Sequence, residues 1–164
     1  MQNSSSEYRN YDLWVRLRQT AHAIHKAREK ELRQSGISIM ESAALFIVQA
    51  IGRKATLVEI SRLLFREPNS VSELVRRMEK NGLVRKVKDL DKRNMIRVVL
   101  TEKGEQAYSQ ASKRASIHRI MSVLSEADRQ QFDSYLIKLS KKAITELGRS
   151  SIPPIPTDYM STHV

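Results

Sequence analysis

The stretch from Pro68 to Thr101, PNSVSELVRRMEKNGLVRKVKDLDKRNMIRVVLT, decides the fold of this 164-residue chain. Four apolar residues in its first half recur at the i, i+3, i+4, i+7 spacing that places one face of a helix against a core. They are Val71, Leu74, Val75 and Met78. Asn81-Gly82 then ends the helix, because glycine readily adopts the left-handed conformation that follows many helix C-termini. The first half is therefore predicted to be a helix with one buried face.

A β-hairpin is predicted directly after this helix. The segments 84–88 and 95–100 are rich in β-branched residues, and they flank the charged, turn-forming segment 89–94. In the second strand, Ile96, Val98 and Leu100 share one face.

Two further helices are predicted before Pro68. Periodic apolar runs place them at 39–51 and 57–64, and the tight connection 65–67 follows the second one. The connection joins the helix at 57–64 to the helix that begins near Pro68. Two helices joined in this way form a helix-turn-helix, whose second helix reads the major groove of DNA. With the hairpin added, the prediction is a mainly α fold with a small β-hairpin, a winged helix-turn-helix occupying residues 37–102.

Three capping-box patterns mark helix starts in this region. They are Ser38-x-x-Glu41, Thr56-x-x-Glu59 and Ser70-x-x-Glu73. In such a box the hydroxyl accepts a hydrogen bond from a backbone N–H of the first turn, and the carboxylate reaches back to the cap residue. The third start is ambiguous, because Pro68 also suits the first helical position with Glu67 as its cap.

The chain is strongly basic, and the excess charge is concentrated. It has 29 Lys and Arg against 18 Asp and Glu, a formal net charge of +11 and an isoelectric point near 10.1. Residues 76–97 hold nine Lys or Arg and three acidic residues, a net +6 and more than half of the total. Such a patch predicts double-stranded DNA as the partner.

The helix face opposite the buried one, together with the first strand, supplies the candidate DNA contacts. They are Asn69, Ser70, Ser72, Glu73, Arg76, Arg77, Lys80 and Arg85. The base-reading candidates are Asn69, Ser72, Glu73, Arg76 and Lys80, whereas Arg77 is expected to meet a phosphate. The two serines can cap the helix or contact DNA. Glu73 has three candidate roles: it completes the cap, orients Arg76 or Arg77, or accepts from a cytosine amino group.

Several classes of protein are not supported by the sequence. The chain has no cysteine, which excludes disulfides, thiolate zinc sites and thiol redox sensing. It shows no catalytic triad order, phosphate loop or cofactor motif, so we expect neither an enzyme nor a bound cofactor. His22 and His25 lie one helical turn apart, but surface or packing roles are favoured over a metal site. Without a membrane-length apolar run or a signal-peptide core, a soluble cytoplasmic protein is expected.

Helices are also predicted at both ends of the chain. One spans about 11–33, a second leads from Thr101 through Ala107, Ala111 and Ala115 towards Leu124, and a third follows Ser125 and ends at Gly148. We assign 8–36 and 103–148 to one helical lobe whose excess apolar faces predict a two-fold homodimer. Two reading helices about 34 Å apart would recognise a pseudo-palindromic operator. Residues 149–164 are read as a tail or arm.

The succession of SIMESAALFIVQAI, TLVEISRLLF, NSVSELVRRMEKNGLVRK, DKR and LTEKG resembles the MarR family of winged-helix transcription regulators, over roughly residues 8–148. The resemblance implies a homodimer, usually a repressor, with wing tips in the minor groove. The family's wing pattern falls on Asp91-Lys92-Arg93, so that Arg93 would enter the minor groove and Asp91 would hold its guanidinium. Between Arg93 and Leu100-Thr101 this chain has one residue more than the family pattern. Lys92 could therefore share the role of Arg93 at the tip or take it over.

The resemblance also implies a small effector, often aromatic or anionic, bound between the helical lobe and the winged helix. Candidate lining residues are Trp14, His22, Tyr108 and His118. The alternative to a DNA-binding regulator is a winged-helix interaction or scaffold module whose basic hairpin docks on an acidic partner protein.

Overall fold

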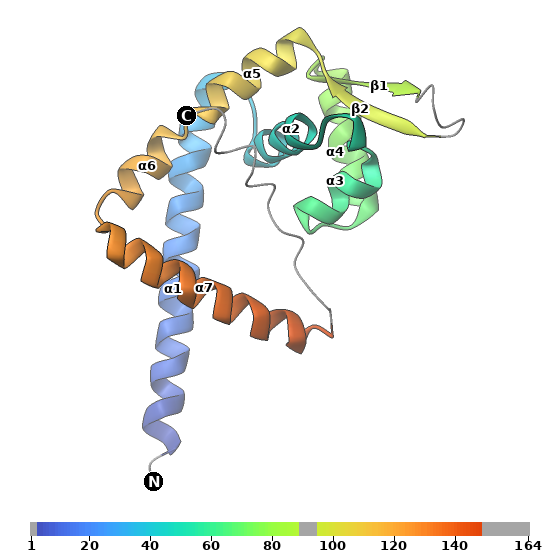
Figure 1. Ribbon diagram of the computed structural model, residues 1–164. Coiled ribbons are helices and arrows are strands. Elements are labelled where there is room, and N and C mark those ends of the chain that lie inside the picture. Colours follow the sequence, from blue (N-terminus) through green and yellow to red (C-terminus); the bar gives the residue numbers. More distant parts are fainter. Residues whose placement is uncertain (1–2, 89–94, 149–164) are drawn as a thin grey trace.

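The computed structural model describes residues 3–88 and 95–148, and it is mainly helical with one antiparallel hairpin (Figure 1). The predicted fold class is confirmed. The helices are α1 (Asn3–Leu32), α2 (Ile39–Ile51), α3 (Leu57–Leu64), α4 (Pro68–Lys80), α5 (Glu102–Ser112), α6 (Ala115–Met121) and α7 (Glu126–Glu146), with short 3-10 turns at Arg33–Ser35 and Gly52–Lys54. The strands are β1 (Val84–Lys88) and β2 (Ile96–Leu100).

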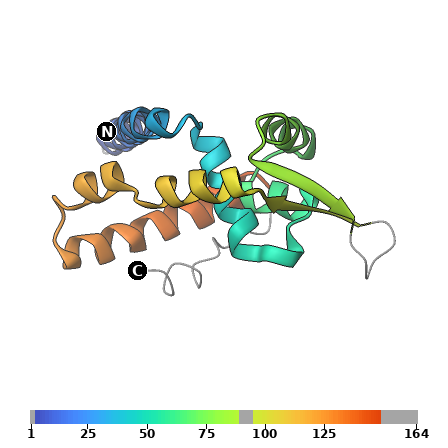
Figure 2. The same cartoon turned by 90° about the horizontal axis from the view of Figure 1, so that it is seen from above.

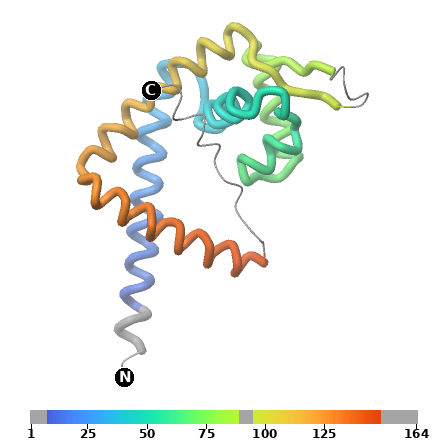
Figure 3. The backbone as a smooth tube through the Cα atoms, viewed as in Figure 1, coloured from blue at the N-terminus to red at the C-terminus, as the bar shows by residue number. Residues whose placement is uncertain are grey.

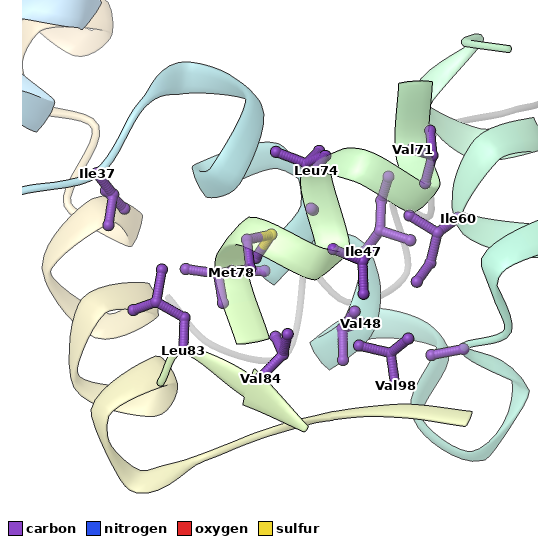
Figure 4. Close-up of a cluster of buried hydrophobic side chains, with 14 of the residues drawn as sticks. Ile37, Ile47, Val48, Ile60, Val71, Leu74, Met78, Leu83, Val84 and Val98 are labelled. Carbon is purple, nitrogen blue, oxygen red and sulfur yellow. The ribbon is translucent and has the colours of Figure 1, made fainter. Parts of the chain in front are cut away.

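Helix α2 forms the centre of the winged helix, where it contacts α1, α3, α4, α5 and β2. The four apolar residues predicted to face the core from α4 are each at most 4% exposed, which confirms that face. Figure 4 shows Val71 beside Ile60 of α3 and Met78 close to strand residue Val84, in one cluster with Ile47 and Val48 of α2. Burying the α4 stripe leaves its polar face outward.

The hairpin is attached to the helices through its second strand. β1 and β2 pair antiparallel from Val84↔Leu100 to Lys88↔Ile96. On its other side β2 bonds to the segment before α3, because the Val98 N–H donates to the Ala55 carbonyl at 2.8 Å and Thr56 bridges to Arg97. The wing is therefore held to the rest of the lobe by backbone hydrogen bonds as well as by packing.

The capping patterns have three different outcomes. Ser38 and Glu41 form the full predicted box, with bonds of 3.2 and 2.8 Å. Thr56 caps α3, but Glu59 pairs with Arg62 instead of reaching back. The third box does not form, since α4 begins at Pro68 with Glu67 at its cap position. Of the two starts left open by the sequence, the structure has the one in which the fixed φ of proline begins the helix.

The end of α4 and the start of α5 meet in a tight packing contact. Gly82 adopts the expected left-handed conformation (φ 72°), and the Leu83 N–H bonds to the Met78 carbonyl at 2.9 Å, as in a Schellman cap. At Gly104 a Cβ atom would lie 1.9 Å from the Leu83 carbonyl oxygen. The hydroxyl of Thr101 donates to the Gly82 carbonyl and accepts from the Gly104 N–H. The Leu-Thr-x-x-Gly motif therefore ends in glycine because a side chain at position 104 would clash with the Leu83 carbonyl.

Helix α1 extends away from the winged helix, whereas α7 runs from the end of α6 back towards its side of the molecule (Figure 3). Helix α1 packs on α6 and begins at Asn3, eight residues before the predicted start, because its polar first turns carry no apolar period. α1 and α7 cross in Figure 1, but Figure 2 shows them separated in depth. Among the described residues no single helix is long and apolar enough to cross a membrane; only the pair 8–35 and 39–54, bent by 76°, meets that test of length and composition.

The predicted single helix from Thr101 towards Leu124 is wrong. α5 ends at Ser112, Arg114 takes a left-handed conformation (φ 46°), and α6 starts at Ala115. We call residues 113–114 the α5–α6 joint. The carboxylate of Glu31 in α1 accepts from the backbone N–H groups of Ala115 (2.8 Å) and Ser116 (3.1 Å) and from the Ser116 hydroxyl.

Arg28, one helical turn before Glu31, completes this cluster. Its guanidinium lies 2.9 Å from the Glu31 carboxylate and donates to the Ala111 carbonyl at 2.6 Å. Partial burial raises the pKa of Glu31, but the hydrogen bonds from Ser116 and Arg28 outweigh it and lower the pKa from 4.5 to about 2.

Acid titration of Glu31 should destabilise the fold. A carboxylate whose pKa is about 2 when folded and about 4.5 when unfolded contributes stability that is complete above pH 4.5 and is lost as the pH falls towards 2. Glu31→Gln should therefore lower the free energy of unfolding at pH 7 and reduce its decline between pH 5 and pH 2, as measured by urea denaturation. Glu29→Gln, which removes an exposed carboxylate paired with Lys26, is the control and should stay close to wild type. An unchanged acid limb in Glu31→Gln would contradict the assignment.

Candidate nucleic-acid interface

The outward face of α4 carries every α4 residue predicted to meet DNA. All seven are exposed, and they are Asn69, Ser70, Ser72, Glu73, Arg76, Arg77 and Lys80. Arg85, the predicted contact on β1, is exposed as well, and β1 packs against α4. The opposite stripe of α4 is buried, so the helix has no freedom to turn this face inward. The arrangement presents polar and basic side chains to a groove-sized partner.

An ion pair orients Arg76 on this face. The Glu73 carboxylate lies 2.7 Å from the Arg76 guanidinium. The hydrogen bond from Arg76 lowers the pKa of Glu73, and the same bond raises the pKa of Arg76. Of the three roles open to Glu73, capping is excluded by the start of α4 at Pro68, and the structure shows the orienting contact.

Glu79 connects α4 to strand β1 of the hairpin, a role that the sequence did not reveal. Its carboxylate accepts from the Lys86 backbone N–H at 3.1 Å and lies 3.3 Å from the Lys86 ammonium. Because α4 and β1 are separated only by the Gly82 turn, this contact fixes the angle of the strand against the helix. The only indication in the sequence was that Glu79 is a single acidic residue among the basic residues Arg76, Arg77 and Lys80.

Sequence reasoning also missed Arg66. It lies in the turn between α3 and α4, where no helical period marks it, and lines a hollow of about 230 Å³ beside the first turns of α4. Ser70 and Arg77 line the same hollow, together with Met40 of α2. Two guanidinium groups and a hydroxyl are donors suited to a backbone phosphate. A basic residue directly before Glu67-Pro68 was the only available sequence signal.

The predicted wing-tip residues Asp91, Lys92 and Arg93 lie outside the described residues. The strands on either side of them run from Val84 to Lys88 and from Ile96 to Leu100. The exposed Lys88 continues the basic character of the patch to the last described residue of β1.

A second cavity of about 350 Å³ lies where α1, α2, α5 and α6 meet. Its walls are mostly apolar, with arginines contributed by α1 and by the α5–α6 joint. The lining residues are Arg28, Ile39, Ser42, Ala43, Phe46, Tyr108, Ala111, Ser112, Arg114 and Ile117. The guanidinium of Arg114 lies over the Phe46 ring, 5.5 Å from its centroid. This cavity can accept a small ring with a negative group.

Only one of the four predicted effector-lining residues, Tyr108, lines this cavity. Trp14 is 53% exposed on α1, where it contacts Tyr11 (centroids 5.5 Å apart) and lies beneath Arg18. His22 and His118 are exposed. These three residues therefore lie outside this cavity, because aromatic character along a helix does not show which turn faces the neighbouring lobe. Across residues 3–88 and 95–148 no cluster of three His, Asp or Glu could hold a metal ion.

The comparisons with known proteins agree with this geometry. Residues 39–104 match the family model described as a winged helix DNA-binding domain. A MarR family protein from Bacillus stearothermophilus has a similar structure, with 25% identity, a TM-score of 0.67, and 84% of this chain and 96% of that one covered. An uncharacterized HTH-type transcriptional regulator of Bacillus subtilis, YwoH, is 31% identical over 63% of this chain and 74% of its own length.

This chain belongs to the MarR family of winged-helix transcriptional regulators. The organohalide-sensing regulator RdhR-CbdbA1625, crystallised with 2,4-dichlorophenol, is 32% identical, with a TM-score of 0.73, and 81% of this chain and 80% of that chain are covered. The MarR family consists of DNA-binding transcriptional regulators rather than enzymes, and the matched domain contains the whole of α4.

The Glu73–Arg76 pair should restrain non-specific binding to DNA. Glu73→Gln removes a negative charge from the contact face and releases Arg76, so affinity for random duplex DNA should rise roughly 3- to 10-fold at low salt. Fluorescence anisotropy at 50–100 mM salt would measure it. Glu126→Gln is a matched control, because it neutralises an exposed carboxylate paired with Arg129 on α7, away from α4. Equal increases in the two variants would show that net charge alone is responsible.

Proposed function

We propose that this MarR-family chain is a homodimeric repressor that reads a pseudo-palindromic operator with two copies of α4 in successive major grooves. The observation that carries the proposal is the division of α4 into a buried apolar stripe and an exposed face of polar and basic side chains. Lys and Arg contacts to phosphates supply affinity, and the outward polar residues of α4 supply base readout. The protein acts in the cytoplasm.

The outer helices supply the dimer interface in this proposal. Large apolar side chains on α1 and along α7 are exposed in the single chain. They are Tyr8, Tyr11, Leu13, Trp14 and Leu17 on α1, and Phe132, Tyr135, Ile137 and Leu139 on α7. So many large apolar side chains exposed on two helices are normally covered by a partner. Residues 8–36 and 103–148 therefore form the dimerisation lobe, 37–102 form the DNA-binding lobe, and 149–164 are assigned as a tail or arm.

The wing completes the contact with DNA. Arg93 enters the minor groove, Asp91 pairs with its guanidinium, and Lys92 shares the contact at the tip. This role is supported by the run of cations along β1, where Arg85, Lys86 and Lys88 lead towards the segment that contains these residues. Arg66 joins Arg77 as a phosphate contact, because both line the hollow beside α4.

Salt dependence separates the roles of the arginines. Arg77→Ala should weaken binding to all duplexes alike and reduce the slope of log affinity against log salt by about 1. Arg76→Ala should instead relax the preference for one base pair, at roughly 1–3 kcal/mol of discrimination. Anisotropy titrations at several salt concentrations, on an operator obtained by selection from random duplexes, measure both effects. Arg119→Ala on α6 removes an equal charge away from α4 and is the control.

Two results would overturn the proposed function. A wild-type complex whose affinity for DNA is independent of salt would contradict the proposed phosphate contacts. A selection that recovers no symmetric motif with half-sites 10–11 base pairs apart would favour the scaffold alternative, in which the basic hairpin docks on an acidic protein.

We further propose that the cavity between the lobes binds a small aromatic anion that regulates DNA binding. Its apolar walls suit a ring, and Arg114, whose guanidinium lies over the Phe46 ring, supplies positive charge at its edge. The sequence relative RdhR-CbdbA1625 was crystallised with 2,4-dichlorophenol, a small aromatic ring. A ligand here would touch α2 of the winged helix and α1, α5 and α6 at once, so it could alter their relative positions.

Thermal unfolding with two probes tests this effector class. If Arg114 selects an anion, 2,4-dichlorobenzoate should raise the melting temperature more than an equal concentration of 2,4-dichlorophenol at neutral pH. At 100-fold excess over its Kd, the rise with 2,4-dichlorobenzoate should be about 5–10 °C. Ser42→Phe fills the cavity and should abolish the shift while leaving DNA affinity without ligand within roughly twofold. Exposed Ser109→Phe on α5 is the matched control. A shift that survives Ser42→Phe would place the ligand elsewhere.

A further inference from the structure

The α5–α6 joint is a sharp break in what the sequence predicts as one helix. Arg114 has φ 46° and ψ 32°, a conformation that L residues with a Cβ rarely adopt. Such a conformation persists only where surrounding contacts hold it, and it is therefore a reason to look for those contacts. The break turns the chain away from α5, which continues directly from the wing strand β2, into α6 and α7.

Helix α1 holds both sides of the joint. On the α5 side, Arg28 donates to the carbonyl of Ala111. On the α6 side, Glu31 accepts from the first two backbone N–H groups of the helix, Ala115 and Ser116. Arg114 at the cap position makes no side-chain capping bond, so Glu31 does from 84 residues away what a local Ser or Asp normally does.

The joint is also tied to the winged helix. The Arg114 guanidinium stacks over the Phe46 ring of α2, and α2 in turn contacts α4. Contacts therefore run from α1 through the joint to α2 and on to the recognition helix. A change of angle at the joint moves α6 and α7 relative to α4, and α7 carries much of the apolar surface proposed for the dimer.

We propose that Glu31 is a positioning residue for DNA binding, which fixes the angle of the α5–α6 joint and thereby the separation of the two α4 helices in the dimer. This inference rests on the proposed dimeric function. Glu31 acts through the joint, because its carboxylate is occupied by the donors of Ala115, Ser116 and Arg28. Its role concerns spacing between half-sites, whereas α4 determines affinity for each half-site.

Only a carboxylate meets the hydrogen-bonding demands of this position. Oε1 accepts from the Ala115 N–H, and Oε2 accepts from the Ser116 N–H and hydroxyl while facing the Arg28 guanidinium. Every neighbour is a donor. Glutamine has nearly the same shape, but its NH₂ group would confront a donor at one of the two oxygen positions. Glu31→Gln therefore loosens the joint without opening a cavity.

The experiment compares DNA duplexes that differ only in half-site spacing. The full-length protein is titrated by anisotropy against the selected operator, against versions with one base pair inserted or deleted between the half-sites, and against an isolated half-site. Wild type should bind the altered spacings at least about tenfold more weakly, since each base pair shifts and rotates one half-site relative to the other. Glu31→Gln should reduce this discrimination to less than about threefold and bind the operator more weakly, while its affinity for the isolated half-site stays at the wild-type value.

Two further variants keep the result interpretable. Glu29→Gln changes the next acidic residue on α1, which is paired with Lys26 at 2.8 Å, and should behave as wild type. Ser116→Ala removes only the hydroxyl donor to Glu31 and should give an intermediate loss of spacing discrimination, even if Glu31→Gln does not fold. Far-UV circular dichroism and sedimentation establish folding and dimerisation of each variant.

The outcomes separate this inference from the function on which it rests. Wild-type discrimination in both Glu31→Gln and Ser116→Ala overturns the positioning role of Glu31, as does an equal loss of affinity for the operator and the half-site. A wild-type protein that is monomeric or ignores spacing overturns the dimeric function as well.

Discussion

The packing of one face of α4 against α2, α3 and β1 is the constraint on which the rest of the structure depends. Val71, Leu74, Val75 and Met78 are almost completely buried, so rotating the helix would bring polar side chains into the core and apolar ones into water. This fixes which side chains face outward. Pro68 and the Gly82 cap set where the helix begins and ends, and together they decide the orientation of the residues that we propose as DNA contacts.

Acidic residues within the basic surface have separate structural tasks. Glu73 orients Arg76 along the outward face, and Glu79 holds Lys86 and the backbone of β1 against α4. Exposed pairs of this kind contribute little to stability, so their effect lies mainly in where they hold a cation. A guanidinium held in place by a carboxylate loses less freedom on meeting a base edge, and the same carboxylate repels phosphate where no base partner is present.

The connection between the winged helix and the outer helices is made of short, directional contacts. Gly104 lets α5 approach the Leu83 carbonyl closely, so the wing strand and α5 leave the lobe in one direction. At the other end of α5, Arg28 and Glu31 hold the joint to α1, and Arg114 lies on Phe46. The cavity that we propose as an effector site has Arg28, Phe46 and Arg114 in its wall, so a ligand there would touch the same contacts that hold the joint.

The sequence by itself determined the winged helix, because local patterns set each of its elements. The apolar period of α4, the Ser38 box, the Asn81-Gly82 stop and the β-branched strands all act within a few residues, and each was found where it was predicted. The outward residues of α4 followed from the same period. Only the tertiary structure decided the start of α4 between two possible caps, the break at Arg114, and the residues that line the cavity. Beside the break, Glu31 accepts hydrogen bonds from residues more than 80 positions away, and the cavity is lined by α1 together with α2, α5 and α6. Such contacts leave no local period in the sequence, because what stabilises them is the meeting of segments that the chain places far apart.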